Sequence, residues 1–397
     1  MKYTKVFSKD AFAQGDELII YGASVYGEIA FHALKKIGIT PTYYCDRSIN
    51  QDEYLGIKVI SPDDVDSHRD SIFIIASSDY FMEIVKFLKG RGCNNLYNMN
   101  FLLSVEIDSD MLSSRAADFY NKKEAYIDIA NADINDDEIS FPRLQFVVTS
   151  ACSLRCRDCI SLMQYYSHPA NSNLFAYKRG FEKIVQCVAN IFDLRILGGE
   201  PFVNKDSYKI IEWFHDEDKI KAISFYTNGT IIPTDKTLEQ LAREKVRLHI
   251  SDYGEVNKNK VDKLVEVLEG KGIRYYIQPY DYWQDAGNLK KRGYTDEKKK
   301  FLFESCYERE CYSYFNGKLY HCPRAAHGIN LGVIPDNPHE YIDLMDDKLS
   351  LSELKIKLKE QREKAFIEAC DYCNGADSRR FKIPPAVQIN NVKDFWE

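Results

Sequence analysis

Three cysteines at short spacing are the clearest chemical feature of the sequence. Cys152, Cys156 and Cys159 form a C-x3-C-x2-C pattern directly after a strand-like run at 144–148. Three thiolates at this spacing can ligate three irons of a cubane and leave the fourth iron without a protein ligand. A zinc site or buried free cysteines are the alternatives, but structural zinc sites take four ligands. The spacing therefore favours an iron-sulfur cluster with one open iron.

Three further segments lie where predicted strands of the same region end. They are Gly198-Gly199-Glu200-Pro201, Thr227-Asn228-Gly229-Thr230 and His249-Ile250-Ser251-Asp252. Each alone could be an ordinary tight turn or an Asx cap. Strand ends are also where α/β barrels place their active sites. The candidate site residues of this region are Gly198, Gly199, Glu200, Pro201, Thr227, Asn228, Ser251 and Asp252.

The pattern resembles the radical S-adenosylmethionine (SAM) superfamily, whose signature is C-x3-C-x2-C after the first strand of a partial TIM-like barrel. The resemblance implies that the open iron chelates the amino and carboxyl groups of SAM. One electron, from a reductase such as a flavodoxin or ferredoxin, then cleaves SAM to methionine and a 5'-deoxyadenosyl radical. It also implies that 198–201 bind the SAM ammonium and that 249–252 lie near its ribose and carboxylate. Asp158 departs from the family, which commonly has an aromatic residue there.

A second set of thiols occurs near the C-terminus, and its members are Cys306, Cys311, Cys322, Cys370 and Cys373. One cubane takes four thiolates, and a four-thiolate zinc site is the rival. Asn316-Gly317 predicts a two-residue hairpin turn, which pairs Phe315 with Lys318. The same register places Cys311 opposite Cys322, about 5 Å apart at Cβ, and favours Cys311 as a ligand.

This second set resembles the SPASM and shorter twitch extensions of radical SAM enzymes. The matching pattern is Cys306-x10-Gly317-x4-Cys322 followed by Cys370-x2-Cys373, which favours Cys306 as a ligand. A full SPASM set needs more cysteines after Cys373, so the resemblance implies one auxiliary 4Fe-4S cluster. The spare thiol, Cys306 or Cys311, is either structural or a catalytic hydrogen-atom donor, as in radical SAM epimerases.

The N-terminal hundred residues alternate short strands with helices, which is the βαβ rhythm of a parallel sheet. Gly22-x-Ser24-x-x-Gly27 follows the first predicted strand, and Asp46 ends the second. Backbone amides at such a helix start can hold a pyrophosphate, and the acid can bind a ribose hydroxyl. The order resembles small Rossmann-like modules attached to sugar-modifying enzymes. A nucleotide-linked substrate, a purely structural or assembly role, and NAD binding are the three alternatives.

The expected fold class is α/β in three parts. We expect a small Rossmann-like domain at 1–105, a helical connector at 106–140, a partial (β/α)6 TIM-like barrel at 141–295 and a twitch/SPASM-like iron-sulfur domain at 296–397. The barrel strands are predicted at 144–148, 193–197, 222–227, 246–251 and 273–278, with helices near 176–190, 206–215, 235–244 and 257–269.

Composition and charge argue against nucleic-acid-binding, membrane-spanning and secreted proteins. A formal net charge of -7 over 397 residues argues against non-specific nucleic-acid binding. No apolar run approaches the roughly 20 residues that span a bilayer, and the N-terminus has no secretory signal pattern, so we expect a cytoplasmic protein. Eleven cysteines in a reducing compartment point to metal or redox roles. Cys45, Cys93 and Cys187 are expected to be buried apolar residues.

These features together predict a radical SAM enzyme that abstracts hydrogen from a small molecule. We expect a sugar or nucleotide sugar as the substrate, with dehydrogenation or epimerisation as the outcome. A peptide maturase of the SPASM class is the rival enzyme. A non-catalytic iron-sulfur or zinc protein is the rival of another class.

Overall fold

The structure is a computed structural model that describes residues 16–47, 52–77, 81–120, 123, 138–376 and 382–389. The chain divides into two compact units, residues 1–137 and 138–397. Within the described residues, no helix is long and apolar enough to cross a membrane.

The first unit is built on a six-stranded sheet in the order β3-β4-β2-β1-β5-β6. All neighbours are parallel except β3 and β4. β1 and β5 are buried along their whole length, which accounts for their continuous apolar sequences. The elements are β1 (Leu18–Tyr21), α1 (Val25–Lys36), β2 (Tyr43–Cys45), β3 (Glu53–Tyr54), β4 (Ile57–Ile60), β5 (Ile72–Ile75), α2 (Phe81–Gly90), β6 (Leu96–Asn98) and α3 (Ser114–Tyr120).

The described part of the expected connector packs onto this first unit. Ala116 and Tyr120 belong to the core that surrounds α1. The buried carboxylate of Glu28, on α1, accepts a hydrogen bond from the Ser113 hydroxyl at 2.7 Å. The stretch 131–137, expected to end a helix, lies outside the described residues.

The second unit holds both the expected barrel and the expected C-terminal cluster domain. Its barrel elements are β7 (Ser140–Phe141), β8 (Arg143–Thr149), α5 (Leu174–Cys187), β9 (Asn190–Ile191), β10 (Leu194–Gly198), α6 (Lys209–Phe214), β11 (Ile223–Thr227), α7 (Asp235–Leu241), β12 (Val246–Asp252), α8 (Lys258–Gly270) and β13 (Tyr275–Pro279). The later elements are β14 (Trp283–Gln284), α9 (Asp296–Glu304), β15 (Cys311–Phe315), β16 (Lys318–Tyr320), α10 (Pro323–Asn330), β17 (Tyr341–Asp343), α11 (Leu351–Glu363) and β18 (Lys382–Ile383).

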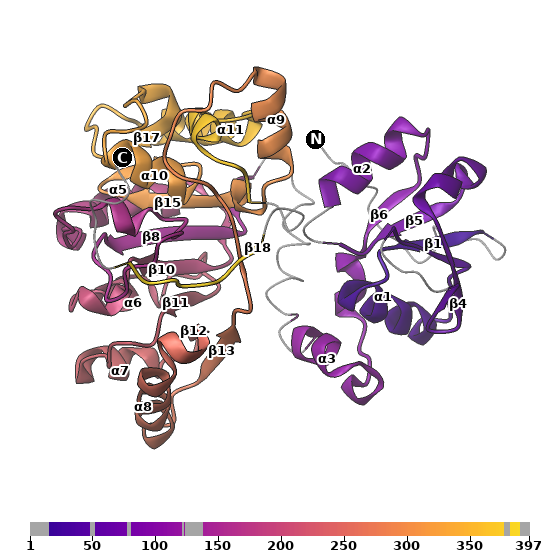
Figure 1. Cartoon of the computed structure of the whole chain (residues 1–397), viewed down its shortest axis with the longest axis horizontal. Coiled ribbons are helices and arrows are strands. Elements are labelled where there is room, and N and C mark those ends of the chain that lie inside the picture. Colours follow the sequence, from indigo (N-terminus) through magenta and orange to yellow (C-terminus); the bar gives the residue numbers. More distant parts are fainter. Residues whose placement is uncertain are drawn as a thin grey trace. The chain divides into compact units, whose positions relative to one another are not determined.

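One sheet of eight strands joins these elements in the order β13-β12-β11-β10-β8-β15-β16-β17. The first six strands of this order are parallel. The sixth parallel strand, β15, pairs with β8 and not with β13, so the sheet remains open and no barrel closes (Figure 1). The α/β class and the parallel core agree with the expectation, and the partial barrel is an open, curved sheet extended by the C-terminal hairpin.

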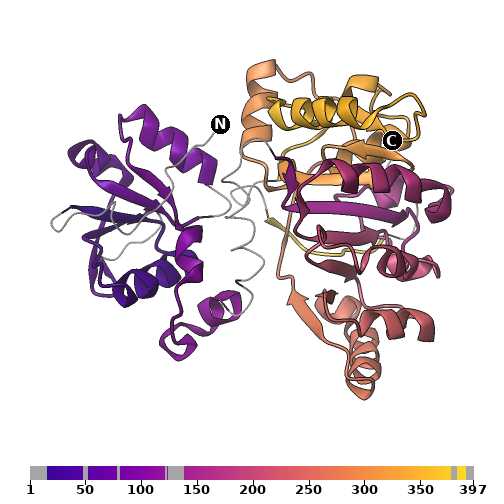
Figure 2. The ribbon, with the colours of Figure 1, turned by 180° about the vertical axis from the view of Figure 1, so that it is seen from behind.

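The two faces of this sheet differ in chemistry. Helices α5, α6, α7, α8 and α11 share one apolar core with alternate strand residues such as Phe146 and Phe225. Figure 2 shows this helix-covered side, where α11 in yellow-orange packs on α5 in magenta. The intervening strand residues face the opposite side, since side chains alternate along a strand. There the guanidinium of Arg195 lies 4.9 Å from the ring of Tyr226, which stacks on His249 at 4.6 Å.

The predicted hairpin is present, and its end corrects one expectation. Asn316 and Gly317 have φ of 50° and 80°, and Phe315 pairs with Lys318. The antiparallel ladder ends at Ser313 and Tyr320, however, so Cys311 does not pair with Cys322. Cys322 instead caps α10, whose first residue Pro323 has no N–H to continue a ladder. Cys311 pairs with Arg143 on β8.

Candidate active site

The three cysteines lie on a loop that leaves the end of β8. Cys152 and Cys159 are partly exposed and Cys156 is buried. The three sulfurs interact electrostatically with one another, and burial raises the pKa of the Cys152 and Cys156 thiols to about 12. Burial also raises the pKa of the Cys159 thiol, and the backbone amides of residues 161–163 near its sulfur partly offset this effect. Three thiols that share one loop fit a cluster whose irons keep the thiolates deprotonated.

Two glycines at the end of β10 allow the backbone to pass directly beside this loop. A Cβ on Gly198 would lie 2.2 Å from the Thr149 carbonyl oxygen, and one on Gly199 would lie 2.3 Å from that of Ala151. The close approach is used for hydrogen bonds, since the Gly199 amide donates to Thr149 O at 3.1 Å and the Glu200 amide to Ala151 O at 2.9 Å. Gly198 and Gly199 therefore allow the end of β10 to lie against the cysteine loop and to hold it by backbone hydrogen bonds.

Glu200 is fully buried and organises the neighbouring strand end. Its carboxylate accepts hydrogen bonds from the Thr227 hydroxyl at 2.8 Å, the Asn228 amide at 2.8 Å and the Phe202 amide at 3.2 Å. These bonds favour the charged form, but burial outweighs them and raises the pKa of Glu200 to about 7. Pro201 begins the short helical turn that Glu200 caps. The carboxylate has about four acceptor positions, so one remains for a ligand.

Asn228 links the glutamate to the cysteine loop. Its side-chain amide donates to the Ser153 hydroxyl at 3.1 Å and approaches the Cys152 sulfur at 3.6 Å. Asn257, which the sequence did not single out, donates to the carbonyls of Asn228 at 2.6 Å and Ser251 at 2.7 Å. The ends of β10, β11 and β12 are thus joined into one polar network beside the cysteines.

Ser251 and Asp252, the predicted pair at the end of β12, have different roles. The Ser251 side chain lies near the phenols of Tyr253 and Tyr280. The Asp252 carboxylate accepts a hydrogen bond from the Gly254 amide at 2.8 Å, which stabilises the local turn. Tyr253 also packs edge-on against Trp283, with ring centroids 5.4 Å apart. Sequence reasoning missed these aromatic residues because they come from separate loops.

Four of the five later cysteines gather in one place. Cys306, Cys322, Cys370 and Cys373 line an apolar cavity of about 40 Å³. Their sulfurs interact with one another, and burial raises the pKa of the Cys306 and Cys370 thiols to about 12. Within the described ranges, no three His, Cys, Asp or Glu side chains are placed to hold a single metal ion.

A buried cation accompanies this four-thiol group. Arg324 lines the same cavity and is only 4% exposed. Its guanidinium donates to three carbonyl oxygens, of Tyr372 at 3.0 Å, Gly287 at 2.6 Å and Asn288 at 2.8 Å. Of the described carboxylates, none pairs with it. A buried charge needs compensation, and an anionic iron-thiolate group in the cavity would supply it.

Cys311 lies apart from the other four thiols. It belongs to the polar face of the sheet, is 1% exposed, and has Glu308, Arg143 and Arg195 as its charged neighbours. Burial raises the pKa of the Cys311 thiol well above its usual range. Cys45, Cys93 and Cys187 are buried free thiols, as the sequence predicted.

The glycine-rich loop of the first unit is built for close packing. A Cβ on Gly22 would lie 2.6 Å from the Ala76 carbonyl oxygen, and one on Gly27 would lie 2.0 Å from that of Gly22. Ser24 stands before α1 but caps it with no side-chain hydrogen bond. The Asp46 carboxylate accepts a hydrogen bond from the Ala23 amide at 2.8 Å. The Asp46 carboxylate thus lies beside the glycine-rich loop, and one of its oxygens is hydrogen-bonded to that loop.

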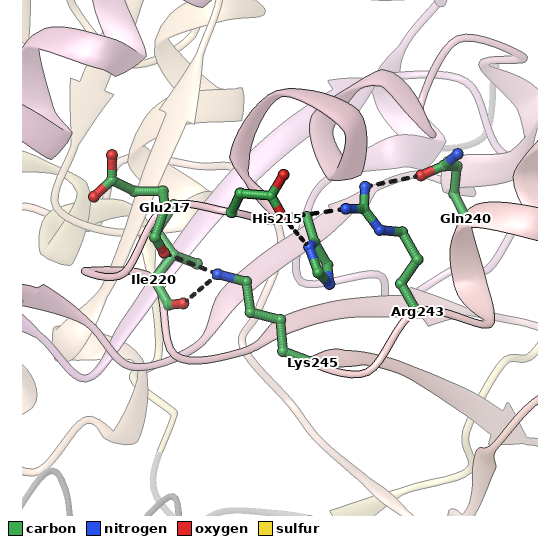
Figure 3. A network of polar contacts seen from close by, with 7 residues as sticks. His215, Glu217, Ile220, Gln240, Arg243 and Lys245 are labelled. Atoms are coloured by element: carbon green, nitrogen blue, oxygen red, sulfur yellow. Dashed lines mark hydrogen bonds and ion pairs between the residues drawn. The ribbon is translucent and has the colours of Figure 1, made fainter.

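A hollow in the second unit lies at the other end of the strands. It measures about 400 Å³ and is lined by Lys221, Lys245 and Arg274, which precede β11, β12 and β13. Lys245 donates to the carbonyls of Glu217 and Ile220, both at 2.8 Å (Figure 3). Lys221 and Arg274 likewise donate to backbone carbonyls. These cations tie loops together, far from the cysteine loop that follows the opposite ends of the strands.

Residues 143–262 match the protein family described as a 4Fe-4S single cluster domain. This segment contains the cysteine loop, both glycines, Glu200 and the two later strand ends. This family match supports the predicted resemblance of residues 143–262 to the radical SAM superfamily. The expected 4Fe-4S cluster and SAM are the cofactors of that superfamily, and the radical SAM segment carries the residues predicted for both.

The curated relatives that match part of the chain include enzymes named GTP 3',8-cyclase. The protein of Campylobacter lari is 26% identical over 114 residues, which is 28% of this chain and 35% of the relative. That of Actinobacillus pleuropneumoniae serotype 7 is 30% identical over 107 residues, 26% of this chain and 31% of the relative. The chain thus spans about a third of the length of the curated relatives it matches.

Solved structures with a partly similar chain course include three that were determined with bound AdoMet or S-adenosylmethionine. BtrN in complex with AdoMet and 2-DOIA covers 64% of this chain and 100% of its own, with 16% identity and a TM-score of 0.37. The protein anSMEcpe, with AdoMet and a peptide, covers 65% of this chain and 95% of its own, with 13% identity and a TM-score of 0.38. SuiB of Streptococcus suis, with S-adenosylmethionine, covers 45% and 42%, with 20% identity and a TM-score of 0.29.

Proposed function

We propose that this protein is a radical SAM enzyme that abstracts hydrogen from a sugar or nucleotide sugar. The observation that carries the proposal is the joining of the cysteine loop to Glu200 and Asn228 through hydrogen bonds at three adjacent strand ends. Cys152, Cys156 and Cys159 would hold the 4Fe-4S cluster. When bound, the cluster and SAM supply a 5'-deoxyadenosyl radical.

The chain's own residues then have distinct tasks. Glu200 holds Thr227 and Asn228 and has one acceptor position left for the SAM ammonium. Asn228 donates toward the Cys152 sulfur, which stabilises its thiolate. Tyr253 and Trp283, beside the same loop, exclude water from the reacting atoms.

Cys306, Cys322, Cys370 and Cys373 would hold one auxiliary 4Fe-4S cluster in this proposal. Their shared cavity and the buried, carboxylate-free guanidinium of Arg324 support this set over one that includes Cys311. Cys311 is then the spare thiol. Its position on the polar face of the sheet, beside Arg195, suits a hydrogen-atom donor to a substrate bound there.

The two outcomes differ in where the electrons go. In epimerisation, the Cys311 S–H bond breaks and a new substrate C–H bond forms, and the sulfur regains one electron and one proton from the reductase and water. In dehydrogenation, the substrate radical would lose a proton and a second electron, and an auxiliary cluster held by the four later thiols would supply the acceptor for that electron. The position of Cys311 favours epimerisation.

The test is reductive cleavage of SAM by anaerobically reconstituted protein. Wild type is expected to bind about eight irons if two cubanes form and to release 5'-deoxyadenosine. Cys156→Ala should lose this activity, and Cys370→Ala should keep it with about half the iron. Cys187→Ala, a buried thiol elsewhere in the same unit, is the matched control. Activity that survives in Cys156→Ala would refute the proposed site.

The iron content also separates the two candidates for the fourth auxiliary ligand. Cys306→Ala should lose about four irons, and Cys311→Ala should lose none. One zinc in place of four irons would remove the auxiliary cluster from the proposal. Turnover in deuterated water should place deuterium on a sugar carbon in wild type and not in Cys311→Ala.

The substrate class is tested by binding. A nucleoside diphosphate sugar such as UDP-glucose is expected to bind the full chain in calorimetry, and Asp46→Asn is expected to weaken that binding through the loop of the first unit. If the substrate is a peptide, the rival class, UDP-glucose should give no heat of binding in calorimetry.

A further inference from the structure

A segment from the far C-terminal end of the described chain lies along the cysteine loop. β18 pairs with β14, which places Ile383 opposite Trp283. The chain then continues to residues 387–389, drawn in yellow, which run beside the loop that follows β8 (Figure 1). Neither the cysteine pattern nor the glycine-rich segments drew attention to this part of the sequence.

Backbone hydrogen bonds hold this segment to the loop in an antiparallel bridge. The Arg157 amide donates to Val387 O at 2.8 Å, and the Ile389 amide donates to Arg155 O at 2.9 Å. These two bonds flank Cys156 and place Gln388 directly opposite it. The pairing spans 232 residues of sequence, so it brings two distant parts of the chain into register.

The side chain of Gln388 completes the contact. Its Nε2 donates to the Cys156 sulfur at 3.2 Å and to Ala386 O at 2.7 Å, and its Oε1 accepts from the Arg155 amide at 2.8 Å. The orientation of the amide group follows from its partners. A backbone N–H can only donate and a carbonyl can only accept, so Oε1 must face Arg155 and Nε2 must face Ala386 and the sulfur.

We infer that Gln388 is a positioning residue for the radical SAM cluster, because its amide N–H donates to the Cys156 thiolate and stabilises the reduced state. The inference rests on the proposed function, in which Cys156 is a cluster ligand. Hydrogen bonds to the sulfurs are one of the levers that set the potential of an iron-sulfur cluster. A donor stabilises the more negative, reduced state more than the oxidised state, and therefore raises the reduction potential.

The structural and electronic contributions of Gln388 can be separated by choice of variant. Gln388→Glu keeps an oxygen for the Arg155 amide, so the segment stays on the loop, but it replaces the donor to sulfur by a second oxygen. Gln388→Ala removes both contacts. Gln164→Ala is the matched control, because Gln164 donates to the loop carbonyls of Arg157 and Cys159 and to no sulfur.

The measurement is a redox titration of anaerobically reconstituted full-length protein by electron paramagnetic resonance, following the signal that changes when SAM is added. Charge-assisted hydrogen bonds are about twice as strong as neutral ones. We therefore expect about a ten-fold lower ratio of reduced to oxidised cluster at a fixed potential in Gln388→Glu and Gln388→Ala, which is a shift of about 59 mV for one electron. Gln164→Ala should titrate with wild type.

Two results would overturn the inference. In the first, Gln388→Glu and Gln388→Ala both have the reduction potential of wild type. In the second, Gln164→Ala shifts the potential as far as the Gln388 variants do.

The contact between Gln388 and Cys156 can also be tested in protein that holds no iron. In iron-free protein, Cys156 should be alkylated by iodoacetamide several-fold more slowly in Gln388→Glu than in wild type, because the donor that favours its thiolate is replaced by an acceptor, and equal rates would refute the contact. Absence of iron at the loop in wild type would instead refute the proposed function.

Discussion

Replacing Gly199 by alanine tests whether the approach of the strand end to the cysteine loop is required. A Cβ at this position would lie 2.3 Å from Ala151 O and 2.8 Å from the Cβ of Cys152. Ordinary contact begins at about 3.4 Å, so the loop or the strand end must move by about 1 Å. Overpacking of this kind costs about 1–3 kcal/mol.

The displaced group is the loop that carries Cys152, and it is also the partner of the Glu200 amide at 2.9 Å. We therefore expect Gly199→Ala to retain less iron in the radical SAM site and to keep the iron of the four-thiol group. A loss of about 1–3 kcal/mol corresponds to a fall in melting temperature of roughly 2–12 °C for a unit of this size.

Gly270→Ala is the matched control for this experiment. Gly270 ends α8, and a Cβ there meets no atom within 4 Å. Alanine at that position should leave the iron content unchanged and leave stability unchanged or raised by up to about 1 kcal/mol. Calorimetric melting and iron analysis are measured on both variants. The reasoning is refuted if Gly199→Ala melts with wild type and binds the same iron.

Three further outcomes follow from the same geometry. Burial raises the pKa of Glu200 from 4.5 to about 7, so the cofactor-free native state holds one proton more than the unfolded chain between these values. Stability should therefore fall by up to about 3 kcal/mol as the pH rises from 4.5 to 7; urea titrations should show this fall in wild type and a smaller one in Glu200→Gln. Gly317→Ala should cost more than Gly332→Ala in thermal melting, because both have positive φ but only Gly317 has Met345 and Tyr177 against its Cβ position. Equal losses of stability in the two variants would mean that the cost comes only from the backbone conformation, about 1–2 kcal/mol. Glu308→Gln should make the Cys311 thiol react faster with a disulfide reagent at pH 9, because Glu308 raises the pKa of that thiol; an unchanged rate would contradict the placement of Glu308 beside Cys311.

Local pattern was sufficient to predict several elements of the second unit. The strand expected at 246–251 is β12, Val246–Asp252, and the helix expected at 257–269 is α8, Lys258–Gly270. Each of these depends on periodicity within one element, which the sequence displays directly. The Asn316-Gly317 turn was likewise predictable because both turn positions need positive φ.

Contacts that depend on how a strand ends or where a loop returns were not predictable in the same way. The hairpin register was correct at Phe315, but its extension to Cys322 was wrong because Pro323 begins a helix there. The pairing of β15 with β8 could not be read from spacing, since it joins strands separated by most of the unit. Gln388 is the same case, a single polar residue whose role depends on a partner 232 residues away.

The two groups of thiols are adjacent in the structure, and this adjacency constrains how each can work. Ile160, the residue after Cys159, lines the cavity of the four later thiols. Burial raises the pKa of the Cys159 thiol, and the guanidinium of Arg324, which lines the same cavity, partly offsets that effect. A guanidinium buried between two sets of sulfurs stabilises negative charge on both, since the protein interior screens charge weakly. If each group held a cluster as proposed, reduction of one would make reduction of the other less favourable, while the shared cation would favour reduction of both. An electron received at the four-thiol group would then lie close to the proposed SAM site, which suits an enzyme that must return or remove one electron in each turnover.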